Sequence, residues 1–229
     1  MIEKQNNLTA TPESILGDNN TVINIAKKPI YNFFKRVFDI LFSSIGLLVL
    51  AIPFLIISLI IVIDSPGAAP IHWQERVGKN GKIFKFYKFR SMVPNAENML
   101  NELLSKNEME GPVFKIKDDP RITKIGHFMR KTSIDELPQL WNVLRGDMSM
   151  VGPRPPLPRE YKVYNDYQRQ RLEVIPGMTC YWQVQPKRNS LTFDEWLELD
   201  LKYIAERGLW TDLVILFRTI DAVLGMEGE

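Results

Sequence analysis

The chain has 229 residues, enough for one compact domain with its own hydrophobic core and too few for two large ones. Hydrophobic residues make up 45% of the sequence and charged residues 24%, a composition typical of globular proteins. Lys and Arg (29) nearly balance Asp and Glu (27), and the resulting net charge of +2 gives no support to a nucleic-acid-binding protein.

The first 28 residues are polar and rich in asparagine. They contain no apolar run of the kind that forms the core of a signal peptide. We therefore expect residues 1–28 to be a disordered or weakly helical lead-in.

Residues 40–63 form an apolar segment without a charge, bounded by Asp39 and Asp64. As a straight helix the segment would extend roughly 36 Å, against a hydrocarbon core of about 30 Å. A buried helix of a soluble protein is the alternative, but Leu, Ile, Val and Phe occupy every face of this predicted helix. The composition therefore predicts a membrane segment.

Pro53 divides the membrane segment and predicts a break in its helix, because proline removes a backbone donor. Each half is then about as long as half a bilayer is thick. Basic residues, which mark the cytoplasmic side, flank both ends of the segment: Lys27, Lys28, Lys35, Arg36, Arg76, Lys79 and Lys82. A re-entrant helical hairpin over residues 29–64 satisfies both flanks. A single-span anchor with a proline kink is the alternative.

The rest of the chain carries both strand and helix signals. Strand-like aromatic residues interleave with lysines over residues 81–90, which predicts a short β-hairpin. Helices are predicted over residues 94–106, 123–130, 134–144, 161–174, 193–206 and 210–224. Gly146 should stop the third of these helices, prolines should keep residues 151–156 extended, and Pro176-Gly177 indicates a turn. The apolar stripe of the last helix is expected to pack in the core, with a membrane surface as the alternative.

Two adjacent carboxylates, Asp135 and Glu136, stand at the start of a predicted helix. Their structural explanation is a capping box, because Ser133 and Glu136 have the S-x-x-E spacing, as Thr192 and Glu195 also have. Spacing alone favours that explanation. The functional explanation is a phosphate site, because three separated segments carry basic residues: Lys85, Lys88, Arg90, Arg130, Lys131 and Arg154.

A carboxylate at such a site can attack phosphorus once cations neutralise the developing charge. The two histidines and one cysteine do not supply the clustered ligands of a zinc site. If a metal is present it should be a hard cation held by carboxylates and phosphate oxygens, and Mg²⁺ is the natural candidate.

A series of short motifs, in order along the chain, resembles the bacterial sugar transferase family, the monotopic polyprenyl-phosphate phosphoglycosyl transferases. The likeness covers about residues 31–225 and includes the apolar segment split by proline. The motifs are residues 35–39 (Lys-Arg-Val-Phe-Asp), 65–67 (Ser-Pro-Gly), 74–78 (Gln-Glu-Arg-Val-Gly), 87–92 (Tyr-Lys-Phe-Arg-Ser-Met), 133–139 (Ser-Ile-Asp-Glu-Leu-Pro-Gln), 146–149 (Gly-Asp-Met-Ser) and 151–155 (Val-Gly-Pro-Arg-Pro).

The resemblance implies an α+β, mostly helical fold. A re-entrant membrane helix over residues 29–64, broken at Pro53, would precede a small cytoplasmic, membrane-associated catalytic domain over residues 65–229 with a short β-hairpin. It also implies an enzyme that moves a sugar-1-phosphate from a UDP-sugar to undecaprenyl phosphate, the first membrane step of exopolysaccharide or capsule synthesis. The C-terminal part after Cys180 resembles members that act on plain hexoses, so the sugar would be glucose or galactose.

Roles for single residues also follow from the resemblance. Asp135 would be the nucleophile that forms a covalent aspartyl-phosphosugar intermediate, and Glu136 would help to position Mg²⁺, with Asp135 as the other metal ligand. The phosphate- and substrate-binding residues would be Arg130, Arg154, Lys88 and Arg90.

The implied location is the cytoplasmic face of the bacterial inner membrane. The single cysteine, Cys180, fits this setting because a reducing compartment disfavours disulfides. The partners would be a UDP-sugar, undecaprenyl phosphate and the lipid bilayer, with a homodimer and downstream glycosyltransferases as further candidates and no nucleic acid. A non-catalytic membrane scaffold and a membrane-anchored nucleic-acid binder using residues 82–90 are the alternative functions.

Overall fold

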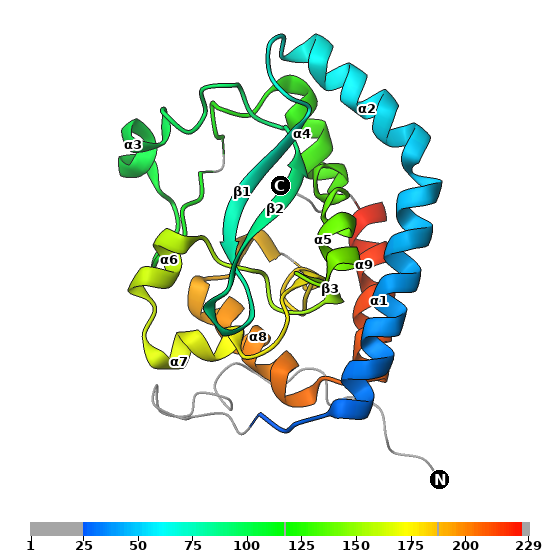
Figure 1. The fold of residues 1–229 in the computed structure, drawn as a ribbon. Coiled ribbons are helices and arrows are strands. Elements are labelled where there is room, and N and C mark those ends of the chain that lie inside the picture. Colours follow the sequence, from blue (N-terminus) through cyan, green and yellow to red (C-terminus); the bar gives the residue numbers. More distant parts are fainter. Residues whose placement is uncertain (1–24, 117, 187, 226–229) are drawn as a thin grey trace.

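A computed structural model of the chain describes residues 25–116, 118–186 and 188–225. The fold is mostly helical, with one β-hairpin near its centre and a long bent pair of helices along one side (Figure 1). Most of the predicted lead-in, residues 1–24, lies outside the described residues, and residues 25–28 carry no helix.

The bent pair consists of α1 (Pro29–Val49) and α2 (Ala51–Asp64), whose axes differ in direction by 60°. No single helix among the described residues is long and apolar enough to cross a membrane, whereas this pair meets both criteria together. The break lies at Leu50, so its predicted position at Pro53 was wrong by three residues. Proline cannot donate to the carbonyl four residues earlier, here that of Val49, and its ring crowds that carbonyl, so the helix is interrupted upstream of the proline itself.

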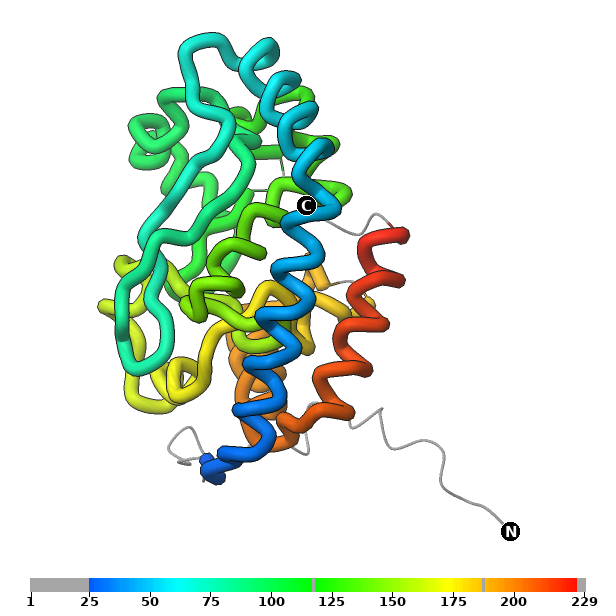
Figure 2. The backbone as a smooth tube through the Cα atoms, turned by 45° about the vertical axis from the view of Figure 1, so that its right-hand side comes forward, coloured from blue at the N-terminus to red at the C-terminus, as the bar shows by residue number. Residues whose placement is uncertain are grey.

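Helix α1 lies along the domain rather than apart from it (Figure 2), packed on α5 (Gln139–Arg145). Asp39 of α1 is buried and accepts hydrogen bonds from the Ser149 hydroxyl (3.0 Å) and from the backbone N–H of Met150 (2.9 Å). The Arg36 guanidinium donates to two carbonyls at the C-terminal end of α5. The polar residues that precede the apolar segment therefore fasten α1 to the domain.

Strands β1 (Ile71–Val77) and β2 (Ile83–Phe89) form a β-hairpin, joined through the short 3₁₀ helix η2 (Lys79–Gly81). A hairpin was predicted, but residues 81–90 supply only its second strand. The pairing is antiparallel throughout. Phe84 and Phe86 lie on one face of β2 and pack against α5, because alternate residues of a strand share a face. This hairpin supplies one wall of the site described below.

A second, smaller sheet was not predicted. It pairs β3 (Ser149–Val151) with β4 (Gly177–Thr179) in parallel. The predicted turn at Pro176-Gly177 was wrong, since Gly177 begins β4. The chain needs glycine here for close approach: a Cβ on Gly177 would lie 2.0 Å from the backbone nitrogen of Gly152.

The remaining helical segments are α3 (Leu100–Leu103), η3 (Leu104–Lys106), α4 (Lys124–Lys131), η4 (Ile134–Glu136), α6 (Pro158–Val163), α7 (Asp166–Arg169), η5 (Gln170–Leu172), η6 (Arg188–Ser190), α8 (Phe193–Glu206) and α9 (Leu209–Leu224). The predictions of α4, α8 and α9 were confirmed, as was the stop at Gly146, which has a φ of 87°. Three other predicted helices were too long. Residues 94–106, 134–144 and 161–174 each contain shorter helical pieces instead.

The core of the C-terminal half forms between α8, α9 and β3, around Leu201, Ile204 and Ile215. Of the predicted apolar stripe of α9, Leu216 packs against this core. Leu213, Phe217, Ile220 and Leu224 are all exposed, and Trp210 is 78% exposed. The core interpretation was therefore wrong for the stripe apart from Leu216. Helix α9 presents the exposed residues to the outside next to α1 (Figure 2), whose apolar residues are likewise exposed.

Candidate active site

The Asp135–Glu136 pair lies in η4, a single 3₁₀ turn between α4 and α5. Ser133 precedes the turn in a left-handed conformation with a φ of 57°, and its side chain caps no helix. The predicted capping box was therefore wrong at this place. After this left-handed residue, the two carboxylates line a pocket instead of capping a helix end.

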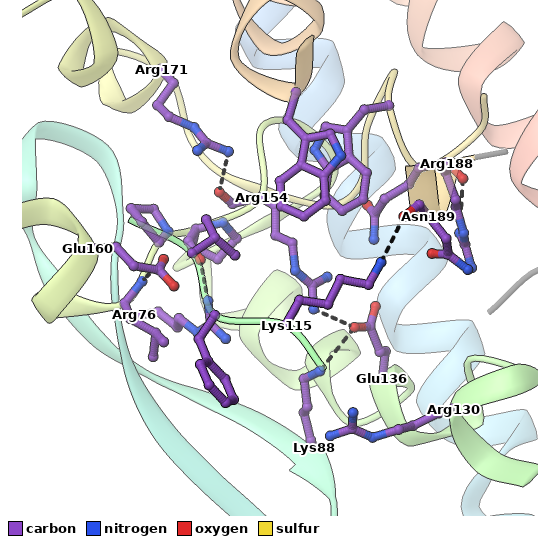
Figure 3. Close-up of a pocket in the computed structure, with 18 of the residues that line it drawn as sticks. Arg76, Lys88, Lys115, Arg130, Glu136, Arg154, Glu160, Arg171, Arg188 and Asn189 are labelled. Carbon is purple, nitrogen blue, oxygen red and sulfur yellow. Dashed lines mark hydrogen bonds and ion pairs between the residues drawn. The ribbon is translucent and has the colours of Figure 1, made fainter. Parts of the chain in front are cut away.

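Glu136 is the centre of an ion cluster in that pocket (Figure 3). Its Oε1 accepts a hydrogen bond from Lys88 Nζ at 3.0 Å and another from Arg154 Nη2 at 2.7 Å. Lys88 also lies 3.8 Å from Asp135 Oδ2. The two cations come from β2 and from the extended loop after β3, so three separated segments meet at one carboxylate.

The two neighbouring carboxylates have opposite pKa shifts. Burial raises the pKa of Asp135 above its usual range, and the nearby Lys88 only partly offsets this. Burial acts in the same direction on Glu136, but Arg154 and Lys88 outweigh it and hold the pKa of Glu136 well below its usual range. Glu136 is therefore the fixed anion of the cluster, and Asp135 is the more basic of the two carboxylates.

Arg130 lines the same pocket, and its Nε donates to the Ser91 hydroxyl at 3.1 Å. Helix α4 comes close enough for this contact because Gly126 lies against the carbonyl of Ser91, where a Cβ would be 2.0 Å from the oxygen. Arg90 does not line the pocket. Its Nε instead donates to the carbonyl of Ala69 at 2.8 Å. Of the predicted site residues outside the membrane segment, the fold thus brings all but Arg90 into one pocket.

The pocket has a volume of 260 Å³ and includes residues that sequence reasoning missed. Arg76 lines it and donates to the carbonyl of Pro155 at 2.9 Å. Arg76 belongs to one of the family-like motifs, which was the available signal. Trp182 and Trp196 line another part of the wall as a stacked pair with ring centroids 4.5 Å apart. No local pattern marked these tryptophans, because residues 14 apart meet only through the fold.

Arg171 was also missed, and it is a buried part of the pocket wall. It forms a buried ion pair with Asp200 of α8 and donates to the backbone carbonyl of Arg154 at 3.2 Å. Burial raises the pKa of Asp200 to about 6, although Arg171 opposes that shift. Neither residue stands in a motif, and only the fold brings them together.

The side chains of the pocket would fit Mg²⁺ if the ion took the rest of its ligands from a substrate and water. Mg²⁺ is usually held by one or two carboxylates, together with substrate phosphates and water, rather than by an all-protein cage. Asp135 and Glu136 are two such carboxylates. Among the described residues no group of three or more His, Cys, Asp or Glu side chains is arranged to hold a metal ion, so phosphate oxygens would have to complete the shell.

The sequence model of a family described as "Bacterial sugar transferase" matches residues 30–226. The chain is 51% identical over 190 residues to "Galactosyl transferase CpsE" of Streptococcus agalactiae serotype III, a match that covers 83% of this chain and 42% of that protein. It is 46% identical over 209 residues to "Undecaprenyl-phosphate galactose phosphotransferase" of Salmonella typhimurium, which covers 90% of this chain and 43% of that protein.

A shorter relative matches over nearly its whole length. "Exopolysaccharide production protein ExoY" of Sinorhizobium fredii is 38% identical over 208 residues, which cover 89% of this chain and 91% of that protein. By contrast, the matches to the Streptococcus and Salmonella proteins span less than half the length of each of those proteins.

Proposed function

Because this chain belongs to the bacterial sugar transferase family, we propose that it transfers a sugar-1-phosphate from a UDP-sugar to undecaprenyl phosphate. This would be the first membrane step in building an exopolysaccharide or capsule repeat unit. The names of two relatives, an undecaprenyl-phosphate galactose phosphotransferase and a UDP-galactose-lipid carrier transferase, support the reaction class. They also favour galactose over glucose as the sugar.

The observation that carries the proposal is the pocket in which Asp135 lies buried beside the Lys88–Glu136–Arg154 cluster. A carboxylate oxygen of Asp135 attacks the β-phosphorus of the UDP-sugar. The bond from that phosphorus to the bridging oxygen breaks, and UMP leaves with the electron pair. An oxygen of undecaprenyl phosphate then attacks the same phosphorus, breaks the aspartyl–phosphate bond and regenerates the free carboxylate.

The pKa shifts support Asp135 rather than Glu136 as the nucleophile. Glu136 already shares one oxygen between Lys88 and Arg154, and its pKa is held low, so its electron pairs are the less available. Asp135 has a raised pKa and only the longer 3.8 Å contact with Lys88. A more basic carboxylate is the better nucleophile once the charge of the substrate phosphates has been offset.

The remaining residues bind and orient. Arg154, Arg130 and Lys88 would contact the diphosphate, because phosphoryl transfer depends mostly on positioning and on stabilising negative charge. Asp135 and Glu136 would hold Mg²⁺, which when bound supplies further neutralisation of the phosphate oxygens.

We further propose that α1 and α2 form a re-entrant membrane segment, with the pocket on the cytoplasmic side of the inner membrane. The 60° bend at Leu50 and the exposed apolar residues of both helices support this topology. The test introduces single cysteines before α1 or after α2 into a Cys180→Ser background. Both cysteines should react with a membrane-impermeant thiol reagent when it is added to the cytoplasmic side, and neither should react when it is added to the other side. Labelling of the two sites from opposite sides would instead favour the single-span anchor.

The reaction is tested by a UMP-release assay with the full chain in detergent, Mg²⁺, undecaprenyl phosphate and a panel of UDP-sugars that includes UDP-galactose and UDP-glucose. We expect UMP with UDP-galactose, and none from the Asp135→Asn variant. Asp194→Asn is the matched control, because Asp194 is exposed in the first turn of α8. Well-folded protein that gives no UMP with any sugar would favour the scaffold alternative.

A further inference from the structure

Three cations of the site lie over the ring of one buried aromatic residue, Phe86. The Arg76 guanidinium carbon is 5.2 Å from the ring centroid, Lys88 Nζ is 5.5 Å from it, and the Arg154 guanidinium carbon is 6.0 Å from it. All three distances are within the range of a cation–π interaction, which extends to about 6 Å. Phe86 is only 1% exposed, so the ring meets the cations away from bulk water.

The hairpin geometry explains why these groups converge. Lys88 follows Phe86 by two residues on β2 and therefore leaves the same face of the strand. Arg76 is paired with Phe84 across the hairpin, and diagonal neighbours on one face are within reach of long side chains, so its guanidinium reaches over Phe86. Arg154 arrives from the loop after β3. Figure 3 shows the Arg76, Lys88 and Arg154 side chains reaching one pocket from these separate segments.

Like charges brought this close repel one another, and the pKa values show it. Burial lowers the pKa of Arg76 to about 10, and Arg154 is the next largest cause. Burial likewise lowers the pKa of Lys88, with Arg154 and Arg130 adding to that shift against the two site carboxylates. Glu136 offsets part of this repulsion for Lys88 and Arg154 through its Oε1, but it makes no hydrogen bond with Arg76 among the described contacts.

We propose that Phe86 is a positioning residue for the phosphate site: the negative face of its ring holds Arg76, Lys88 and Arg154 together, so that the latter two are already in place when a phosphate group arrives. The proposal rests on the proposed function in that the phosphate belongs to a nucleotide sugar. The ring touches no reacting atom. It acts through the cations. Because their side chains are already ordered, they lose less conformational entropy when the phosphate binds.

The plain alternative is that Phe86 only fills the core between β2 and α5. Phe84 provides the control for this alternative. It lies on the same face of the same strand, is 8% exposed and belongs to the same hydrophobic cluster, with the two ring centroids 6.4 Å apart. No cation of the described residues lies over the Phe84 ring. A packing role predicts the same response at both positions, whereas a cation-holding role predicts a response at Phe86 alone.

The test replaces Phe86 with phenylalanines that carry one, two or three ring fluorines, incorporated in the full chain, and repeats the series at Phe84. Fluorine withdraws electron density from the ring face while nearly keeping its size, so folding is preserved. Binding of UMP and of inorganic phosphate is measured by titration calorimetry. We expect the affinity for both ligands to fall stepwise with each fluorine at Phe86, reaching a loss of roughly tenfold, and to stay constant at Phe84.

Equal responses at the two positions, or none at Phe86, would overturn the proposal, as would a wild-type chain that does not bind phosphate. A chain that binds phosphate with the Phe86 dependence but releases no UMP from any UDP-sugar would refute the proposed function alone.

Discussion

Two clusters of buried charge in this molecule each centre on one carboxylate, but one joins helices and the other lines a pocket. In one, Asp212 of α9 accepts hydrogen bonds from Lys35 (2.6 Å) and Tyr31 (2.9 Å) of α1 and from Tyr203 (2.9 Å) of α8. In the other, Glu136 accepts from Lys88 and Arg154 beside Asp135. The Asp212 cluster uses both carboxylate oxygens to join three helices. In the pocket, lysines and arginines outnumber the acidic side chains of the wall.

Charge balance alone does not separate the two clusters. Tyr31, Lys35 and Tyr203 also line a cavity in whose wall basic residues outnumber acidic ones. A wall with more cations than carboxylates is complementary to an anion such as a nucleotide diphosphate. What sets the pocket of Glu136 apart is a second buried carboxylate, Asp135, which stands beside its cations.

The largest expected effect comes from Asp135→Asn. We expect UMP formation to fall by at least about a thousandfold, because the amide cannot form the phosphoenzyme bond. Stability at neutral pH should be unchanged or higher. Burial raises the pKa of Asp135, so the folded protein favours the neutral form, and the ionised form costs stability once the pH rises through that raised pKa. UMP release and the Tm of the same preparation check both statements.

Asp212→Asn should give the reverse result. Lys35 would be left buried without its ion-pair partner, so the free energy of unfolding should fall by about 2–4 kcal/mol. The rate of UMP formation per folded molecule should stay close to that of the wild type, because Asp212 does not line the pocket. Chemical denaturation and the assay under folding conditions measure the two quantities. A large loss of rate with unchanged stability would erase the distinction between the clusters.

Arg154→Lys should have an intermediate effect. Lysine keeps the charge but loses the planar fork that holds Glu136 at 2.7 Å and can grip a phosphate group with two nitrogens. We expect KM for the UDP-sugar to rise roughly tenfold with a smaller change in kcat. Steady-state kinetics measure the split. An Arg36→Lys variant, altered at a helix contact outside this pocket, should leave KM unchanged.

The smallest effect is a displacement of the pH profile. Asp135 must be ionised to attack, and burial raises its pKa. As the pH falls, activity should therefore begin to decline at a pH above the ordinary aspartate pKa of about 3.9. Lys88 must be protonated, and burial lowers its pKa, so the alkaline decline should begin below the range of an ordinary lysine, near 10.4. The pH dependence of kcat/KM reports both limbs. An acid limb at the ordinary aspartate value would contradict the assignment of Asp135.

Local sequence signals predicted a helix start correctly where no distant contact competed with them. The capping box at Thr192 and Glu195 is present and begins α8 as expected, because an apolar face follows it and continues into the core. The same spacing failed at Ser133 and Glu136, where Lys88 and Arg154 compete for the glutamate and the serine turns left-handed. Tertiary contacts decided between two identical patterns.

Features that depend on distant pairing could not be predicted. Strands β3 and β4 have three residues each, too few for a recognisable period, and are held together by the close approach of two glycines. The pocket contributions of Arg76, Trp182 and Arg171 likewise arise only when separate segments meet. The predicted carboxylates and most of the predicted cations were found together because their motifs were recognised, not because spacing required it.

The central claim is that Asp135 becomes covalently linked to a sugar phosphate, and rapid quenching followed by mass spectrometry tests it most directly. The full chain is mixed with UDP-galactose and Mg²⁺ without undecaprenyl phosphate, quenched in acid, digested and sequenced. The account predicts a mass increase of one hexose phosphate on the peptide that contains Asp135, removed by later addition of undecaprenyl phosphate and absent from Asp135→Asn. Two results would contradict it. One is UMP release with the adduct on a residue other than Asp135. The other is the absence of any adduct together with undiminished turnover by Asp135→Asn.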